Sequence, residues 1–452
     1  MATSMTNEAE SSLHDYPSRI RAWSMVGLLV LVAVIATLDR GILSLVIDPV
    51  RHALAISDFQ VSLLQGLSFS LFYATIGLLL GLGADRVRRV RLLTLGIVFW
   101  SLATIAAGLS TGFGSMFMSR LVVGMGEATL GPCCISLICD LFQPLQRGRP
   151  MGLFIMGQAV ASGLSVMLTG SILRHLPHGL LIDLPQRFST PVSLEAWRVA
   201  FIITGLLGLL IVPLLLAAPE PRRMETVSTS QRKSAAQSLR LLSARSKILT
   251  PLLFGFASMS AGFYATLAWG AVSITRRFSI QTVQVSPILG SFSVVFGIVG
   301  PLLAGMLADR VMRQTGSRSR LRLLLIMPLL TVPTMLAPFA PAMPVSAVCI
   351  AFMMVAYPAT STVFFSVLQG VVPNEVRGFT IALCGFINAV IGATCGPLFL
   401  AFLTAHGYAG QAATAFSLST TLLLTTTLGL LLFFAASMSN SNEARTPVPV
   451  EA

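Results

Sequence analysis

The chain has 452 residues, of which 54% are hydrophobic and only 10% are charged, and its formal net charge is +13. Soluble domains carry roughly 25% charged residues, so this composition excludes an ordinary soluble domain. It favours a protein that crosses a membrane several times.

Twelve apolar stretches follow one another along the chain, and each is long enough for a membrane helix of about 20 residues. They are unbroken rather than alternating, which predicts helices and not the strands of a barrel. Lipid offers the backbone no hydrogen-bond partner, and helices satisfy their own backbone groups. We therefore predict an all-α polytopic membrane protein. The stretches are 23–47, 61–82, 92–110, 115–139, 150–173, 197–218, 250–274, 285–308, 321–340, 344–368, 378–403 and 411–435.

The basic residues are unevenly distributed between the connections of these spans. Most of the 30 Lys and Arg fall in the two tails and in the even-numbered connections. This positive-inside pattern predicts that both termini are cytoplasmic, and the charge can also contact anionic lipid headgroups. It requires no nucleic acid. The six cysteines lie in apolar spans without metal-ligand spacing, so we expect packing residues, with no metal and no cofactor.

Four ionisable residues lie well inside predicted spans: Asp39 and Arg40 in the first, and Arg120 and Glu127 in the fourth. An ionised side chain at the bilayer centre costs roughly 2.5–3.5 kcal/mol on insertion scales, so such residues are functional candidates. Two acids and two bases can form a compensated buried network. One interpretation is a static ion-pair lock between the spans. The other is that Asp39 or Glu127 carries a proton while Arg40 and Arg120 tune it or bind an acidic headgroup.

Two motifs recur in the second half of the chain at nearly one offset. Gly81 to Arg86 resembles Gly305 to Arg310, and Pro144 to Gly148 resembles Pro373 to Gly378. This recurrence predicts two related halves around a central substrate site. The stretch between the halves is polar and basic, and its end, SLRLLSARSKIL, is amphipathic enough to lie on the membrane surface. The predicted parts are a cytoplasmic tail 1–22, a six-helix bundle 23–218, a linker 219–249, a second six-helix bundle 250–435 and a cytoplasmic tail 436–452.

The loop after the second span resembles the signature loop of the major facilitator superfamily (MFS). It has the pattern G-x-x-x-D-R followed by basic residues, although Arg88 stands where the family usually has glycine. The resemblance implies the twelve-helix MFS fold and transport by alternating access. It also implies a conformational latch, in which charges of the cytoplasmic connections hold the halves together in the outward-open state. The latch candidates are Gly81, Asp85, Arg86, Arg89, Asp140, Arg147, Asp309, Arg310 and Arg377.

A narrower resemblance is to the spinster-like branch of this superfamily. It is carried by Leu38-Asp39-Arg40, by the run from Arg120 to Ala128, by Asp140-Leu-Phe, and by Trp197-Arg198 with Phe201. The branch is associated with lysolipid and sphingolipid export in animals and has bacterial members. It implies a monomer in the bacterial plasma membrane and makes Asp39 the better proton carrier, with Glu127 second. Organic-anion:proton symporters also carry an Asp-Arg pair in the first span.

The second half offers only mild polar groups as cavity or gate candidates: Pro358, which predicts a kink, and Ser361, Thr362 and Asn388. A charged half facing an apolar half suits an amphipathic substrate. We therefore expect a proton-coupled secondary transporter of a lipid-like compound. A proton-coupled transporter of a small organic acid is the alternative, and a channel or scramblase is a third. The chain has no Walker-type glycine loop and no catalytic or metal-ligand spacing, so we do not expect an enzyme.

Overall fold

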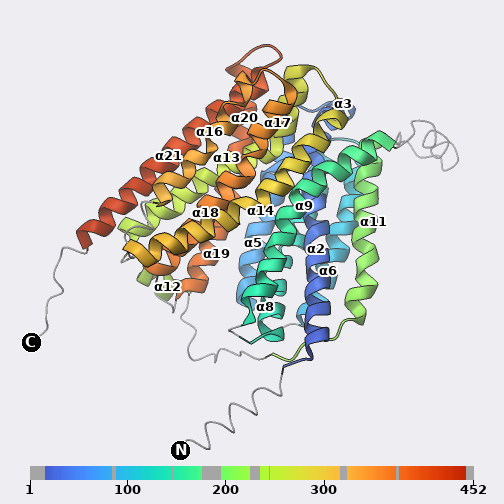
Figure 1. Ribbon diagram of the computed structural model, residues 1–452. Helices are drawn as coiled ribbons and strands as arrows, with labels where there is room; N and C mark the ends of the chain where they lie inside the picture. Colours follow the sequence, from blue (N-terminus) through green and yellow to red (C-terminus); the bar gives the residue numbers. More distant parts are fainter. Residues whose placement is uncertain are drawn as a thin grey trace, which may run out of the picture.

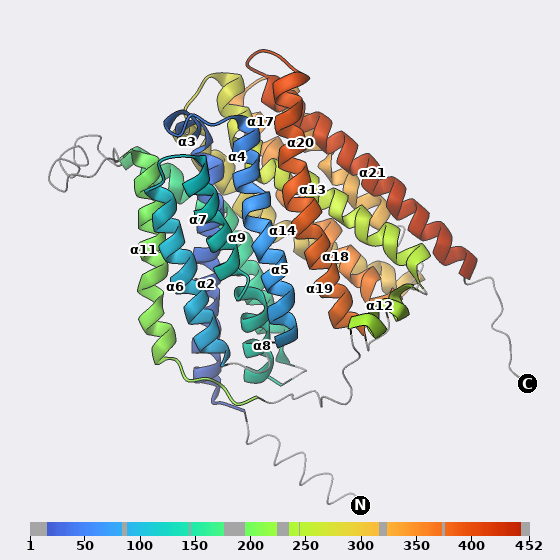
Figure 2. The ribbon, with the colours of Figure 1, turned by 180° about the vertical axis from the view of Figure 1, so that it is seen from behind.

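The computed structural model describes residues 16–83, 88–143, 146–175, 195–223, 235–243, 245–315, 323–372 and 376–443. Within these ranges the chain forms helices and no β-strand. The helices gather into two bundles that lie side by side (Figures 1 and 2). The prediction of an all-α fold with two helical bundles is confirmed for the residues that the structure describes.

The first bundle contains two spans that are single long helices interrupted near their middle. The second span breaks at Gly66, and the fourth breaks at Ala128 and Thr129. The helices of this bundle are α2 (Arg19–Leu45), α3 (Ile47–Ala53), α4 (Asp58–Gln65), α5 (Leu67–Gly83), α6 (Arg89–Gly108), α7 (Phe113–Glu127), α8 (Leu130–Leu141), α9 (Gly148–His175) and α11 (Ala196–Ala217).

The second bundle follows a short surface helix, α12 (Ala235–Ser243). Its eleventh span contains a π-helical segment, a geometry that is rare and often found at functional sites. The elements are α13 (Ser246–Phe278), α14 (Thr282–Thr315), η4 (Met327–Thr331), α16 (Val332–Met335), η5 (Ala337–Phe339), α17 (Met343–Ala351), α18 (Met353–Val371), α19 (Arg377–Ile387), η7 (Asn388–Gly392), α20 (Ala393–His406) and α21 (Ala413–Glu443).

The predicted spans agree with these elements. Eleven helices among the described residues are long and apolar enough to cross a membrane, and the stretch Leu323–Phe339 is a shorter apolar helix at the place of the predicted ninth span. This span is divided into 3-10 and α pieces. Pro328, Pro333 and Pro338 lack the amide hydrogen that a continuous α-helix needs, which explains the division. The exact domain boundaries stay predictions.

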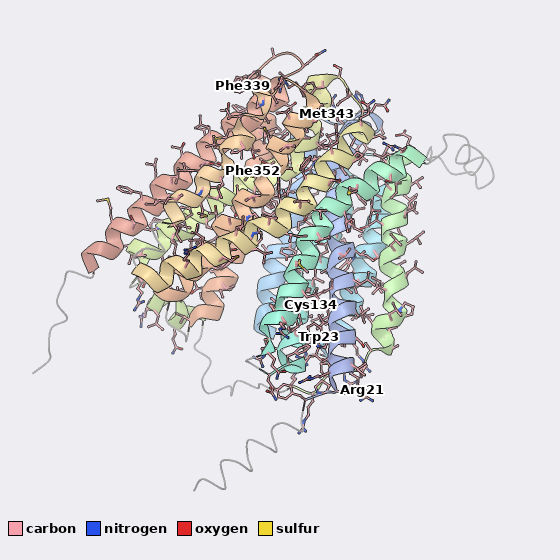
Figure 3. The ribbon with its side chains drawn as sticks, viewed as in Figure 1. Arg21, Trp23, Cys134, Phe339, Met343 and Phe352 are labelled. Atoms are coloured by element: carbon pink, nitrogen blue, oxygen red, sulfur yellow. The ribbon has the colours of Figure 1, made fainter. Side chains whose placement is uncertain are left out.

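The two ends of the molecule differ. Arg21 and Trp23 lie at the end that also carries α8 and α12, whereas Phe339 and Met343 lie at the end that carries α3 and α17 (Figures 1 and 3). We call these the α12 end and the α3 end. The bundles meet through α9 and α14, through α4 and α20, and through α2 and α13. A Cβ atom on Gly163 would lie 2.7 Å from the carbonyl oxygen of Gly290, so only small residues permit this contact of α9 with α14.

Candidate functional site

Helices α2 and α7 bring the four predicted intramembrane charges together. Asp39 and Arg40 are adjacent on α2 and therefore point about 100° apart. Arg120 and Glu127 lie two turns apart on one face of α7. The structure pairs them crosswise: Arg120 lies beside Asp39, and Arg40 lies beside Glu127. Both residues of α2 therefore meet the fourth span.

The Asp39–Arg120 pair is buried, and some of its polar atoms lack hydrogen bonds. Asp39 is 1% exposed, and its Oδ2 accepts a hydrogen bond of 2.7 Å from the Thr104 hydroxyl. Its Oδ1 lies 3.8 Å from Nη1 of Arg120, which is too long for a hydrogen bond. Among the described residues, neither that oxygen nor Nε and Nη1 of Arg120 has a hydrogen-bond partner. A buried polar atom without a partner costs about 1–3 kcal/mol, so this carboxylate stands to gain from a proton or a new donor.

In the Arg40–Glu127 pair, one side chain is buried and the other is accessible. Nε of Arg40 donates directly to Oε2 of Glu127, whose side chain is fully buried, while the Arg40 side chain is 33% exposed. The guanidinium carbon lies 5.2 Å from the ring centre of Phe69 and 5.4 Å from that of Tyr73, both on α5. These contacts hold the cation over two aromatic rings.

Gly124 of α7 explains why α5 reaches this network. A Cβ atom at Gly124 would lie 2.3 Å from the carbonyl oxygen of Phe69, so any larger residue would force α5 away. A Cβ atom at Gly131, in α8 beyond the break of this span, would meet no atom within 4 Å. Of the two glycines, therefore, Gly124 allows a neighbouring helix to approach closely, and Gly131 does not serve this purpose here.

The candidates of the second bundle lie on α18 and at the π-helical segment. Pro358 is inside α18, and its carbonyl accepts a hydrogen bond of 2.8 Å from the Thr362 hydroxyl. Ser361 is half-buried. Asn388 begins η7, and its Oδ1 lies 3.1 Å from the Ser260 hydroxyl. Every buried charged side chain that the structure describes belongs to the first bundle, between Asp39 and Arg198.

The latch candidates at the α12 end are centred on Arg89, which is 1% exposed. Its guanidinium pairs with Asp140 and, at 3.1 Å, with Glu220. Glu220 also accepts hydrogen bonds from the backbone nitrogens of Arg89 and Val90, 3.0 and 2.9 Å long, at the start of α6. All these residues belong to the first bundle, so in this conformation the cluster joins α6, α8 and the end of α11.

The other latch candidates are less informative. Arg147 donates to the carbonyl of Phe142 at 3.0 Å, and Arg310 is exposed. Asp85 and Arg86 lie outside the described residues, as do the surroundings of Gly81 and the side chains of Asp309 and Arg377. Their predicted roles stay predictions.

At the α3 end, a contact between the bundles depends on Arg276 of α13. Its Nη1 and Nη2 lie 2.8 and 3.0 Å from the two carboxylate oxygens of Asp58, and Nη2 lies 2.6 Å from Asp48. Its guanidinium carbon is 5.3 Å from the ring centre of Trp269, whose indole nitrogen donates to the Ser62 hydroxyl at 3.2 Å. These pairs join α3 and α4 of one bundle to α13 of the other.

Sequence reasoning missed several of these residues. Glu220 and Arg276 lie at the ends of spans, where a charge is unremarkable, so nothing in the sequence separates them from solvated charges. Phe69 and Tyr73 are aromatic residues within an apolar helix, which predicts packing against lipid or protein. No group of three His, Cys, Asp or Glu side chains that could hold a metal occurs in the described part of the chain.

A small cavity lies between the bundles near this network. Ser44 of α2, one helical turn beyond Arg40, contributes to its wall. Most of the other lining atoms are apolar, with hydroxyl groups among them; the wall includes Leu45, Val166, Thr266, Leu289 and Met354.

Comparison with known proteins gives a consistent fold. The family model described as Major Facilitator Superfamily matches residues 29–397. An MFS-type efflux pump of Mycolicibacterium smegmatis is 25% identical over 390 residues, which are 85% of each chain. A probable L-galactonate transporter of Escherichia coli is 26% identical over 64% of this chain and 62% of its own. Protein spinster of Drosophila melanogaster is 27% identical over 64% of this chain, but over only 46% of its own length.

A solved structure agrees over nearly the whole chain. It is the crystal structure of a bacterial homologue of the human lysosomal transporter spinster, in an inward-facing and unoccupied conformation. It superposes with a TM-score of 0.80 at 20% identity and covers 96% of this chain and 100% of its own. At this identity the match concerns the fold.

Proposed function

Given that this chain belongs to the Major Facilitator Superfamily and is a multi-pass membrane transporter, we propose that it is a secondary active transporter coupled to protons. We further propose that its substrate is amphipathic, with one acidic end. The observation that carries the proposal is the crossed network of two acids and two arginines, in which only Arg40 is accessible.

The proton is assigned to Asp39, with Glu127 as the second candidate. Asp39 Oδ1 is buried beside Arg120 at a distance that makes an ion pair but no hydrogen bond. In this position the Asp39 side chain can change readily between two states. In one it is ionised and faces the Arg120 guanidinium, and in the other it is protonated and does not. Protonation of one acid leaves an arginine without its counter-charge. The network of two acids and two arginines then carries a net positive charge, which favours an anionic substrate group at the accessible Arg40 and couples proton and substrate binding.

The substrate's acidic end is assigned to Arg40. A guanidinium binds carboxylate or phosphate through two parallel hydrogen bonds, and Arg40 is the network member with exposed surface. The scarcity of buried charge in the described part of the second bundle suits a hydrocarbon chain at the other end. These two features together favour a lipid-like organic acid.

The two bundles suit transport by alternating access. In this conformation they meet at the α3 end through Arg276, Asp48 and Asp58. If the termini are cytoplasmic, as the basic residues predict, this is an inward-open arrangement. Rocking would break these pairs and bring the charged connections of the α12 end together, where Asp85 is the proposed latch residue. Asp85→Asn should then alter turnover.

A second candidate is the transport of a small hydrophilic organic acid. It is favoured by the similarity to the L-galactonate transporter and to a hexuronate transporter of Bacillus subtilis, which is 25% identical over 64% of this chain. In that case Arg40 and Arg120 would both hold the substrate carboxylate. A channel or scramblase has no such support.

The first experiment is a thermal-stability screen of the purified protein with lysolipids, sphingoid bases and small organic acids at two pH values. A ligand that binds the folded state raises its stability by RT ln(1 + [L]/Kd). Stabilisation by lysolipids supports the amphipathic substrate, whereas stabilisation by small carboxylates alone moves the assignment to the second candidate.

The proton site is tested in proteoliposomes with the ligand identified by the screen. Asp39→Asn should abolish accumulation driven by a pH gradient while counterflow exchange at equal pH continues. If the variant still accumulates substrate in response to the gradient, Asp39 is not the proton carrier. Glu127→Gln then becomes the next test.

A further inference from the structure

A group of three polar side chains lies in the second bundle beside the π-helical segment: Ser260 on α13, Tyr357 on α18 and Asn388 on η7. The Ser260 Oγ lies 3.0 Å from the Tyr357 hydroxyl and 3.1 Å from Asn388 Oδ1. It also lies 2.9 Å from the carbonyl oxygen of Phe256. We call this cluster of three polar side chains, named for the amide of Asn388, the amide group.

The amide group has more hydrogen-bonding capacity than its own members use. The Ser260 hydroxyl carries a single proton, so it can donate either to the Phe256 carbonyl or to the Asn388 amide oxygen, but not to both. The amide nitrogen of Asn388 carries two protons, and its contact among the described residues is the Cys384 sulfur at 3.8 Å. Because a thiol sulfur is a weak acceptor, an amide N–H remains for an oxygen of a ligand.

Aromatic stacking fixes the position of the Tyr357 hydroxyl. Tyr357 stacks on Phe263 with ring centres 4.1 Å apart, and on Phe256 at 5.7 Å. Phe256 in turn stacks on Phe364 at 4.0 Å, and all three ring pairs are within 13° of parallel. Because the ring cannot turn without disrupting this stack, its hydroxyl is pre-organised.

Contacts between helices of the two bundles place the amide group near the surroundings of Arg40. Segment η7 contacts both α13 and α5, and α5 supplies the two rings that flank Arg40. Helix α13, which carries Ser260, also contacts α2, which carries Arg40. Arg40, Tyr357 and Asn388 are all partly accessible.

The local backbone allows η7 and α13 to approach each other closely. A Cβ atom at Gly392, the last residue of η7, would lie 2.7 Å from the Ser260 Cβ, so glycine lets the π-helical segment approach α13 closely. Segments of π-helix are rare and often occur at functional sites. Both features bring Asn388 within reach of Ser260.

We propose that the amide group is a second substrate subsite, which binds an uncharged oxygen of the substrate, a hydroxyl or carbonyl, while Arg40 binds the anionic end. No charged side chain of the described second bundle is buried, so a neutral oxygen fits this place better than a second anion. The substrate is then a single-chain organic acid with a polar oxygen near its charged group. The subsite rests on the proposed function and makes its substrate class more specific.

The test uses two probes that differ in one oxygen. They are lauroyl lysophosphatidic acid, which carries a free hydroxyl on its glycerol, and its deoxy analogue, which lacks that hydroxyl. Binding to the full-length protein in detergent is measured by isothermal titration calorimetry. One net hydrogen bond should make the wild-type protein bind the hydroxylated probe about two- to tenfold more tightly.

The variants should remove this preference and nothing else. In Asn388→Leu and in Tyr357→Phe, the affinity for the hydroxylated probe should fall to that for the deoxy probe, which should itself stay unchanged. Tyr357→Phe keeps the aromatic stack and decides the outcome if Asn388→Leu fails to fold. Tyr408→Phe, which removes a hydroxyl that bonds Thr420 rather than the amide group, should retain the preference.

Two results would overturn the subsite, and they are distinguishable. If the wild type binds both probes equally and Arg40→Gln abolishes both, the subsite is refuted while the proposed anion site stands. If neither probe binds saturably, both the subsite and the amphipathic substrate are refuted.

Discussion

Removal of the Arg276 guanidinium should open the α3 end of the molecule. Arg276 of α13 is the residue whose ion pairs join the second bundle to α3 and α4 of the first. Arg276→Gln keeps a polar side chain of similar length but loses the charge. Because Arg51 also lies near both acids, 3.5 Å from Asp58 and 3.9 Å from Asp48, these acids are not left without a counter-charge.

The magnitude follows from the burial of these pairs. The side chains are neither dry nor fully solvated: Arg276 is 20% exposed, Asp58 is 15% exposed and Asp48 is 34% exposed. Exposed ion pairs contribute about 0.2–1 kcal/mol, and hydrogen bonds to charged groups about 1.5–3 kcal/mol. We take about 2 kcal/mol for the whole contact, which corresponds to a roughly 30-fold shift toward open conformations.

The assay is the reaction of a buried cysteine with a hydrophilic maleimide. Ser62 is fully buried between the bundles, next to Trp269, so Ser62→Cys reports opening at this end. The measurement is made in detergent, where the reagent reaches both ends, after the six native cysteines have been replaced. Arg276→Gln should accelerate labelling by one order of magnitude or more.

The matched control is the neighbouring arginine. Arg277 donates to the carbonyls of Ala337 and Ala340 within its own bundle, at 2.6 and 2.7 Å. Arg277→Gln removes an equal charge without touching the contact between the bundles. If both variants label at the same rate, Arg276 does not hold the α3 end closed, and the reasoning is wrong.

Three further predictions concern single sites. Arg40→Lys keeps the charge but loses the planar fork, so the KM for an anionic substrate should rise about tenfold in proteoliposomes while protein stability stays unchanged. Gly124→Ala should lower the free energy of unfolding by about 1–3 kcal/mol in a denaturant titration, because its Cβ meets the α5 backbone; Gly131→Ala should not. Glu220→Gln should lower it by about 1–2 kcal/mol, since the carboxylate bonds Arg89 and the amino end of α6; an unchanged midpoint would exclude that role.

Part of the candidate site was visible in the sequence because a charge inside an apolar span is costly and rare. Asp39, Arg40, Arg120 and Glu127 stand out on that ground alone. Their spacing of seven residues also predicts that Arg120 and Glu127 share one face of a helix. It did not predict the crosswise pairing, since the rotation of α2 relative to α7 decides which residue reaches which. The sequence also did not predict that Arg40 is the accessible member of the network.

The polar contacts between the bundles depend on residues far apart in the chain. Arg276 meets Asp58 and Asp48, and Asn388 meets Ser260, through the packing of helices that no local pattern relates. A serine, an asparagine or an arginine at the end of a span has many ordinary interpretations. Their significance appears only when the partner is known.

The sequence by itself determined the number of spans, their helical form and the duplicated plan. Each of these depends on local properties: the length of an apolar stretch, the backbone's need for hydrogen bonds in lipid, and a motif repeated along the chain. The tertiary structure alone decided how the charges pair and which end of the molecule is closed. It also decided which polar groups border the space between the bundles. These follow from the rotation and docking of whole helices, where small residues such as Gly124 and Gly163 set the distances.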